Sequence, residues 1–186
     1  MAKEAAKEKI YKEILTKDYI QNLIMAAPMH DIGKVTIPDA ILQKAGKLTT
    51  EEYKIMKTHA EKGSEIIKST FGSVGDEEYE RIAYEVAYYH HEKWNGSGYP
   101  TGKKADEIPL CARIMAIADV FDALSSSRCY KEPMPLKQCF EIIKNDAGQG
   151  FDPLLVEIFL QNRRQIEKIC EENNSKSKGI CQGKEE

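Results

Sequence analysis

The sequence lacks the long apolar segments and the excess of basic residues that mark membrane proteins and nucleic-acid-binding proteins. None of its apolar runs approaches the length of a membrane span, and the first ten residues, MAKEAAKEKI, lack the apolar core of a signal peptide. Its 27 Lys and Arg residues are outnumbered by 30 Asp and Glu residues, for a net charge of −3. We therefore expect a cytoplasmic protein that binds neither membranes nor polymeric nucleic acid. An anionic ligand must then be held by local positive charge.

Paired cysteines are also lacking. The five cysteines are an odd number and contain no CxxC pair, which argues against both a disulfide framework and a zinc–cysteine site. We expect them to be buried or incidental thiols. They are Cys111, Cys129, Cys139, Cys170 and Cys181.

Strand alternation and internal repeats are absent as well, whereas apolar residues recur at helical spacing. Thr49-x-x-Glu52 is a capping box that opens a helix expected to carry His59. Further helices are predicted for residues 2–26 with a break at Thr16 or Asp18, for a short segment after Pro38, and for residues 77–91, 110–124, 135–145 and 153–170. The sequence predicts one all-α domain over residues 1–170, followed by a polar, disordered tail over residues 171–186.

What the chain does contain is a concentrated chemical motif, HHEKWNGSGYP at residues 90–100. Two adjacent histidines close a helical run, and a glycine-rich turn follows at once. Neutral imidazole is the commonest side-chain metal ligand, and glycine lets the backbone approach a ligand closely. The stretch indicates the wall of a metal site that receives a substrate. Two surface histidines before an ordinary turn are the alternative.

The other two histidines, His30 and His59, also lie near helix ends or glycine-containing turns. Asp31 follows His30, and Asp119 lies within an otherwise apolar helix, where a carboxylate is costly unless it is paired or bound to metal. A capped or salt-bridged Asp119 is the alternative. Mixed imidazole and carboxylate ligands suit iron, manganese, zinc or nickel. Asp31 has two oxygens with which to bridge two ions, an arrangement that recurs in phosphoester cleavage.

The order of these motifs resembles that of the HD-GYP domain, a group of the HD metal-dependent phosphohydrolases. The resemblance runs from about residue 23 to residue 160 and rests on HDIGK at residues 30–34, MKTH at 56–59, the HHE…GYP stretch at 90–100, and ADVFDAL at 118–124. It implies an HD-domain helical bundle with a di- or tri-metal centre. The implied activity is hydrolysis of cyclic di-GMP to linear pGpG or to GMP by metal-activated water.

The resemblance also implies roles for single residues. The metal ligands would be His30, Asp31, His59, His90, His91 and Asp119, with Asp31 bridging two divalent ions, iron or manganese first and zinc or nickel as alternatives. Asp31 and Lys34 would act in catalysis. Lys34, Arg128 and Lys131 would hold the phosphates, and Tyr99 would contact the ligand.

Each of these residues also has a purely structural interpretation. Lys34 can be a surface lysine or a partner of Asp31, Arg128 can bond the carbonyls of its own loop, and Tyr99 can pack the turn. Glu92 and Asp122 are expected to be structural partners, for example of histidine N–H groups.

Two departures from the family pattern bear on the site. A further family ligand histidine lies upstream of the His–Asp pair, but residues 1–29 contain no histidine. The chain is therefore expected to begin inside the domain. The site of His30, Asp31 and Asp119 would then be incomplete, while that of Asp31, His59, His90 and His91 would be complete. Ser127 and Cys129 also replace the Asp and Pro common around Arg128.

The leading hypothesis is a cyclic di-GMP phosphodiesterase. One alternative is a catalytically impaired module that binds the nucleotide or docks on a cyclase partner. The other is a phosphohydrolase of a different cyclic dinucleotide. GGDEF-type cyclases, sensor proteins and a second copy of the chain are the partners considered.

Overall fold

The chain folds as a bundle of helices. The computed structural model describes the backbone of residues 1–71, 76–126 and 133–181, and side chains up to residue 172. Within these ranges every regular element is a helix, apart from an isolated bridge between Ala147 and Phe151. The predicted all-α fold is thus confirmed.

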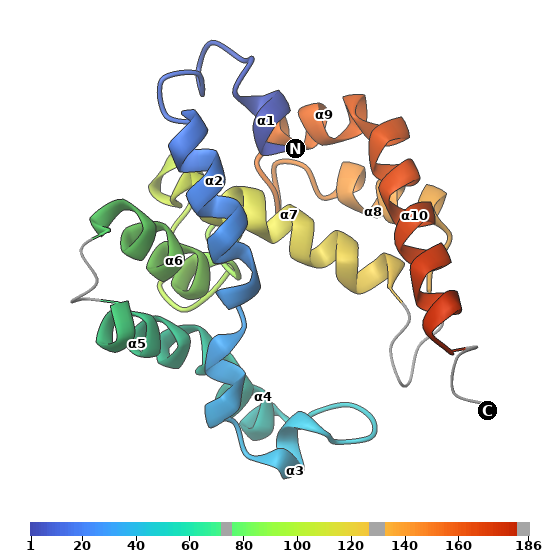
Figure 1. Ribbon diagram of the computed structural model, residues 1–186. Coiled ribbons are helices and arrows are strands. Elements are labelled where there is room, and N and C mark those ends of the chain that lie inside the picture. The colour runs from blue at the N-terminus through green and yellow to red at the C-terminus, as the bar shows by residue number, and fades with distance from the viewer. Residues whose placement is uncertain (72–75, 127–132, 182–186) are drawn as a thin grey trace.

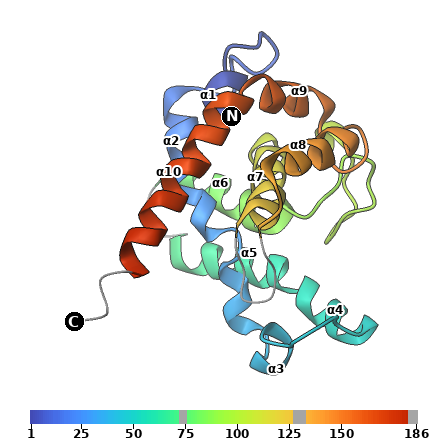
Figure 2. The same ribbon diagram turned by 90° about the vertical axis from the view of Figure 1, so that its right-hand side faces the viewer.

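Figures 1 and 2 show the helices in two groups joined by one central helix. On one side α2, α5 and α6 pack together, and α7 crosses from α6 to α8 and α9 on the other side. The elements are α1 (Ala2–Ala5), α2 (Lys17–Ala26), η1 (Ala27–Met29), η2 (Ile32–Thr36), α3 (Asp39–Leu42), α4 (Thr50–Lys57), α5 (His59–Phe71), α6 (Glu77–Tyr89), η3 (Ala105–Glu107), α7 (Leu110–Ser125), α8 (Leu136–Asn145), α9 (Pro153–Gln161) and α10 (Arg163–Cys181).

The N-terminal segment is less helical than its Ala, Glu and Lys content predicts. Helix α1 stops after Ala5, and turns lead to α2, whose N-cap is Thr16, as expected; the Thr16 hydroxyl accepts a hydrogen bond from the Tyr19 N–H at 3.1 Å. The intervening turns bury Tyr11 and Leu15, which are 4% and 3% exposed. Tertiary burial of these side chains outweighs local helix propensity.

Two predicted helices are each divided in two. The capping box of Thr49 and Glu52 is present, but α4 ends at Lys57 and a new helix begins at His59. The Thr58 hydroxyl between them bonds the Ile55 carbonyl at 2.7 Å. Similarly, Asn162 bonds the Ile158 carbonyl at 2.7 Å and separates α9 from α10. Polar side chains that bond the preceding turn end these helices, a competition that the apolar pattern does not reveal.

Helix α10 continues past residue 170 as far as Cys181, through the first part of the segment expected to be a disordered tail. Residues 182–186 lie outside the described part of the chain. The division of the chain at residue 170 stays a prediction.

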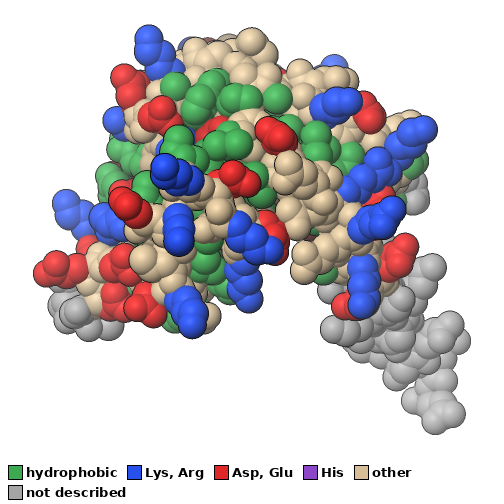
Figure 3. Space-filling view, turned by 90° about the horizontal axis from the view of Figure 1, so that it is seen from above, with side chains coloured by type: hydrophobic (Ala, Val, Ile, Leu, Met, Phe, Trp, Pro, Cys, Tyr) green, Lys and Arg blue, Asp and Glu red, His purple; other side chains and the backbone are tan. Residues whose placement is uncertain are grey.

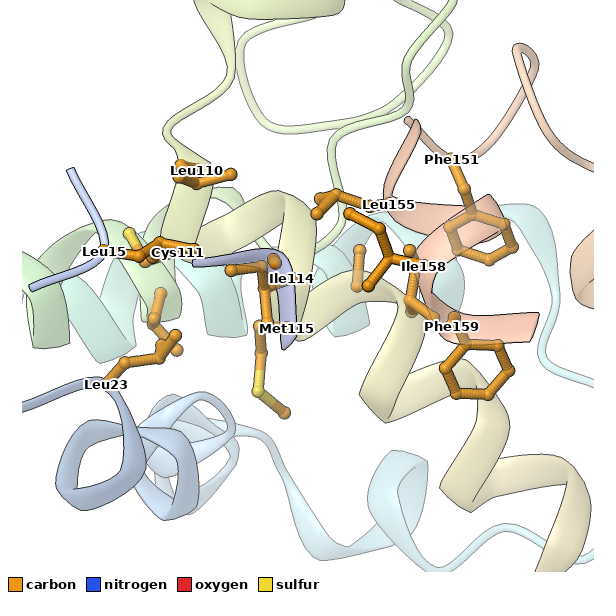
Figure 4. Close-up of a cluster of buried hydrophobic side chains, with 14 of the residues drawn as sticks. Leu15, Leu23, Leu110, Cys111, Ile114, Met115, Phe151, Leu155, Ile158 and Phe159 are labelled. Atoms are coloured by element: carbon orange, nitrogen blue, oxygen red, sulfur yellow. The ribbon is translucent and has the colours of Figure 1, made fainter. Parts of the chain in front are cut away.

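The core lies on both sides of α7. In Figure 4, Leu15 and Leu23 approach α7 from the N-terminal segment, Met115 lies on α7 itself, and Ile158 and Phe159 approach from α9. All five side chains belong to one buried cluster. Since α7 is buried on most of its circumference, its polar residues are held where the core fixes them.

The surface carries charges of both signs. On the face drawn in Figure 3, Lys and Arg side chains are interspersed with Asp and Glu side chains and with apolar ones. In the described part of the chain, none of the helices combines the length and apolar character needed to cross a lipid bilayer.

Candidate metal centre

Two glycines bring the first ligand-bearing segment against α5. A Cβ on Gly33 would lie 2.0 Å from the His59 carbonyl oxygen and 2.4 Å from the Gly63 nitrogen, so only glycine fits. Gly63 faces Gly33 from the middle of α5. This close approach carries Asp31, the residue before η2, to the start of α5, where His59 lies.

Three of the histidines are oriented by main-chain carbonyls. His30 Nδ1 bonds the Ala27 carbonyl at 2.8 Å, and His59 Nδ1 bonds the Met56 carbonyl at 2.7 Å. His90 Nδ1 lies 3.0 Å from the carbonyls of both Val86 and Ala87. A carbonyl accepts a hydrogen bond from Nδ1–H, which favours the tautomer whose Nε2 can bind a metal.

The Nε2 atoms converge on Asp31. Oδ1 of Asp31 lies 3.4 Å from His59 Nε2 and 3.9 Å from His90 Nε2, and His91 Nε2 lies 3.1 Å from His59 Nε2. Ligand atoms of these four residues all lie within 4.8 Å of one another. His59 and His90 are buried, whereas Asp31 is 29% exposed, so the histidines form the floor and Asp31 the open side.

The remaining two predicted ligands lie on the other side of Asp31. His30 Nε2 is 3.3 Å from Asp31 Oδ2 and 3.6 Å from Asp119 Oδ1. The Lys34 amine also bonds Asp31 Oδ2. The two carboxylate oxygens of Asp31 therefore face different groups of side chains.

This arrangement separates the protonation states of the residues. Burial would raise the pKa of Asp31, but hydrogen bonds from His30 and Lys34 hold it well below its usual range. Burial lowers the pKa of His90 to about 4 and that of His91 to about 3. Burial also opposes charge on His30, yet Asp119 and Asp31 outweigh it and raise its pKa to about 10. Burial also lowers the pKa of His59. All four residues of the cluster thus have ligand-competent protonation states at neutral pH.

The turn after His91 is held by Glu92, which is 3% exposed. Its Oε1 accepts hydrogen bonds from the N–H and hydroxyl of Thr101, both at 2.7 Å, and from the Gly102 N–H at 3.1 Å. Glu92 is thus a structural partner, as expected, but its bonds go to the loop and not to a histidine N–H. The Tyr99 ring, carried by that loop, stacks on His91 with centroids 4.7 Å apart.

A cavity of about 180 Å³ adjoins the centre on the side of α7 and α8. Its lining includes His90, His91 and Glu92 together with Asp146 and Phe151. Arg128 and Lys131, two of the predicted phosphate ligands, lie outside the described residues. Asp122 accepts a hydrogen bond from the Ser126 hydroxyl at 2.9 Å, a structural contact.

The residues present fit a metal ion. Asp31 Oδ1 is buried and has no hydrogen-bond partner among the described residues, which is costly for a carboxylate oxygen. The Nε2 atoms of His59 and His90 lie 3.4 and 3.9 Å from this oxygen, and the other nitrogen of each ring is bonded to a main-chain carbonyl. Imidazole nitrogens around one carboxylate oxygen are a typical donor set for a divalent transition metal.

A helical bundle in which a His–Asp pair and three further histidines meet at helix ends defines a metal-site domain of the histidine–aspartate type. The sequence pattern of the HD domain family matches residues 3–155. The chain belongs to this family and, within it, to the HD-GYP group.

Several characterised or named proteins are similar over most of the chain. A probable cyclic di-GMP phosphodiesterase of Vibrio cholerae is 43% identical over 178 residues, which cover 92% of this chain and 39% of that protein. The cyclic di-GMP phosphodiesterase response regulator RpfG of Xanthomonas campestris is 41% identical, covering 84% and 40%. The 3′3′-cGAMP-specific phosphodiesterase 2 of Vibrio cholerae is 46% identical, covering 78% and 26%. The chain thus spans 26–40% of the length of these relatives.

Proposed function

We propose that the chain is a catalytic domain that hydrolyses cyclic di-GMP to linear pGpG or to GMP with the help of bound metal ions. The observation that carries the proposal is the buried, unpartnered Asp31 Oδ1 among histidine Nε2 atoms. The names of the Vibrio and Xanthomonas relatives support the substrate class.

Two ions are proposed, one on each face of Asp31. Oδ1 with His59, His90 and His91 would hold one, and Oδ2 with His30 and Asp119 would hold the other. Iron and manganese are proposed first, with zinc and nickel as alternatives, because imidazole and carboxylate donors suit all four. When bound, such ions lower the pKa of a water and neutralise charge on a phosphodiester.

The chain's own residues position the substrate and the donors. The carbonyl bonds to Nδ1 keep the histidine rings from turning, and buried His59 and His90 exclude water from the floor of the site. Lys34, on the open side, orients Asp31 and supplies positive charge beside one phosphate. Arg128 and Lys131 are proposed to hold the remaining phosphate charge, and Tyr99 to contact the nucleotide.

The test is Asp31→Asn, which keeps the size of the side chain but removes the charge that the two faces share. We expect metal content and cyclic di-GMP turnover to fall together by at least about tenfold, since lost ligands typically weaken metal affinity at least this much. Metal analysis and nucleotide chromatography measure the two effects. Asp39→Asn, at the exposed start of α3, is the matched control and should change neither. Full metal content in Asp31→Asn would refute the assignment.

A second candidate substrate is 3′3′-cGAMP, because a relative specific for it is 46% identical to the chain. Comparing kcat/KM for the two cyclic dinucleotides distinguishes these substrates. A chain that binds either nucleotide without cleaving it, at full metal content, would instead be a binding module. Cytoplasmic location is proposed from the amino-acid sequence, whereas pairing with GGDEF-type cyclases or sensor proteins and homodimerisation are proposed from the resemblance. Co-purification and sedimentation measure the last two.

A further inference from the structure

The last residue of α4, Lys57, holds its charge against two aromatic rings. Its Nζ lies 5.5 Å from the centroid of the Tyr53 ring, one turn earlier on α4, and 5.6 Å from that of Tyr99. A cation within about 6 Å of an aromatic ring centroid is attracted by the ring. The two tyrosines therefore fix the position of an otherwise flexible lysine.

The Tyr99 ring connects this lysine to the metal centre. One face of the ring stacks on His91 at 4.7 Å, and its edge approaches His59 with centroids 6.5 Å apart. Lys57 is thus separated from two of the histidines by a single aromatic ring.

The charge of Lys57 is not neutralised within the described residues, where no carboxylate lies within ion-pair distance of it. Neighbouring lysines differ in this respect. Lys54 pairs with Glu51 at 2.9 Å, and Lys62 with Glu65 at 2.9 Å. Tyr53 is 50% exposed and Lys57 is partly exposed, so both side chains can be reached from solvent beside the site. A fixed, uncompensated cation at a ligand site is suited to a phosphate.

A cyclic dinucleotide brings two phosphodiesters to the protein, on opposite sides of its sugar–phosphate ring. The phosphodiester being cleaved belongs at the metal centre, and Lys34 is already bonded to Asp31 there. We propose that Lys57, held between Tyr53 and Tyr99, binds the second phosphodiester, the one that is not being cleaved. This rests on the proposed function and gives it a residue that selects cyclic dinucleotides over substrates with one phosphodiester.

The experiment compares Lys57→Met with Lys54→Met, a change of the same charge on the same helix, at full metal loading. Two substrates are used: cyclic di-GMP, and bis(p-nitrophenyl) phosphate, which has one phosphodiester. In Lys57→Met we expect the ratio of kcat/KM for the first substrate to that for the second to fall at least about tenfold, mainly through KM, as expected for loss of a charge-assisted contact. Lys57→Arg should restore most of the ratio, and Lys54→Met should leave it unchanged.

An unchanged ratio in Lys57→Met overturns the inference, as does an equal loss on both substrates, which would make the lysine a general support of the metal centre. Measurements on the unsubstituted protein distinguish a failure of the proposed function from a failure of the inference about Lys57. If it cleaves the one-phosphodiester substrate but neither binds nor cleaves cyclic dinucleotides, the proposed function fails and the inference fails with it. If it binds cyclic di-GMP without cleaving it, an unchanged Kd in Lys57→Met overturns the inference alone.

Discussion

At the scale of single residues, the centre depends on the two oxygens of Asp31 having different surroundings. Oδ1 faces His59 and His90, whose rings are buried, whereas Oδ2 faces His30 and Lys34 near the solvent. Burial lowers the pKa of His59 and His90 and keeps them neutral, whereas the raised pKa of His30 keeps that ring protonated at pH 7. Metal binding should therefore depend on pH on one side of Asp31 far more than on the other.

His30 should make metal binding stronger as pH rises. Its pKa of about 10 means that the metal-free ring carries a proton at pH 7, and ligation must release that proton. Affinity at this position should rise up to about tenfold per pH unit and level off near pH 10. His90 and His91, with pKa values of about 4 and about 3, are already neutral and add no slope above about pH 6.

Calorimetric titration with Mn²⁺ at about pH 7 and about pH 8.5, in buffers of different ionisation enthalpy, measures both affinity and proton release. His30→Ala should abolish the proton release while one ion remains bound through His59, His90 and His91. Proton release that persists in His30→Ala would show that another group is the source.

At the scale of elements, the site depends on η2 lying directly on α5. Only the absence of a side chain at Gly33 permits this contact. The family resemblance implied which histidines and aspartates belong together, because they lie in recognisable motifs, near helix ends or turns except for Asp119, which lies within α7. The sequence did not predict the contact of Gly33 with Gly63, because a close approach between distant segments leaves no local periodicity. The break at Thr58 was not predicted because the apolar pattern does not reveal the local bond from its hydroxyl to the Ile55 carbonyl. The bonds of Glu92 to Thr101 and Gly102 depend on the path of the loop, which the sequence pattern does not give.

Gly33→Ala should therefore destabilise the protein and disrupt the cluster together. Its Cβ would overlap the His59 carbonyl, 2.0 Å away, and force η2 off α5. We expect a loss of about 1–3 kcal/mol in the free energy of unfolding, the usual cost of overpacking, and a marked loss of bound metal. Denaturant unfolding and metal analysis measure these effects.

Gly63→Ala is the control with the milder clash, because a Cβ there would lie 3.1 Å from the Gly33 nitrogen. Alanine is also more stable than glycine within a helix such as α5. It should cost less than Gly33→Ala. Equal stability of Gly33→Ala and the parent would mean that η2 can shift without loss.

At the scale of the whole molecule, one buried ion pair joins three distant parts of the chain. Arg113 on α7 bonds Asp152 at 2.9 Å, and the Tyr11 hydroxyl of the N-terminal segment bonds the same carboxylate oxygen at 3.0 Å. Asp152 also caps α9 through the Leu154 N–H at 2.9 Å. Arg113 and Asp152 are 10% and 3% exposed at their side chains, so the pair is shielded from solvent.

Arg113→Leu should destabilise the protein strongly, because it leaves the Asp152 charge buried without its cation. We expect a loss of about 3 kcal/mol, or a fall in Tm of roughly 6–12 °C for a chain of this size. Lys62→Met removes an exposed pair and should change stability by less than about 0.5 kcal/mol. Thermal unfolding of the metal-free protein measures both.

Tyr11→Phe should cost about 1 kcal/mol alone and a different amount when combined with Arg113→Leu, because both side chains bond one oxygen. Strict additivity in this double-mutant cycle would contradict the shared network.

The carbonyl bonds that hold the Nδ1 atoms of His30, His59 and His90 come from each histidine's own preceding turn. The helical turns therefore set the directions of these three ligands independently of any ion. At a site of nitrogen and oxygen donors, intrinsic affinity rises from manganese and iron towards copper, so the metals available in the cell strongly affect which ion binds. We therefore expect the ion found in a purified sample to change with the metals supplied in the growth medium.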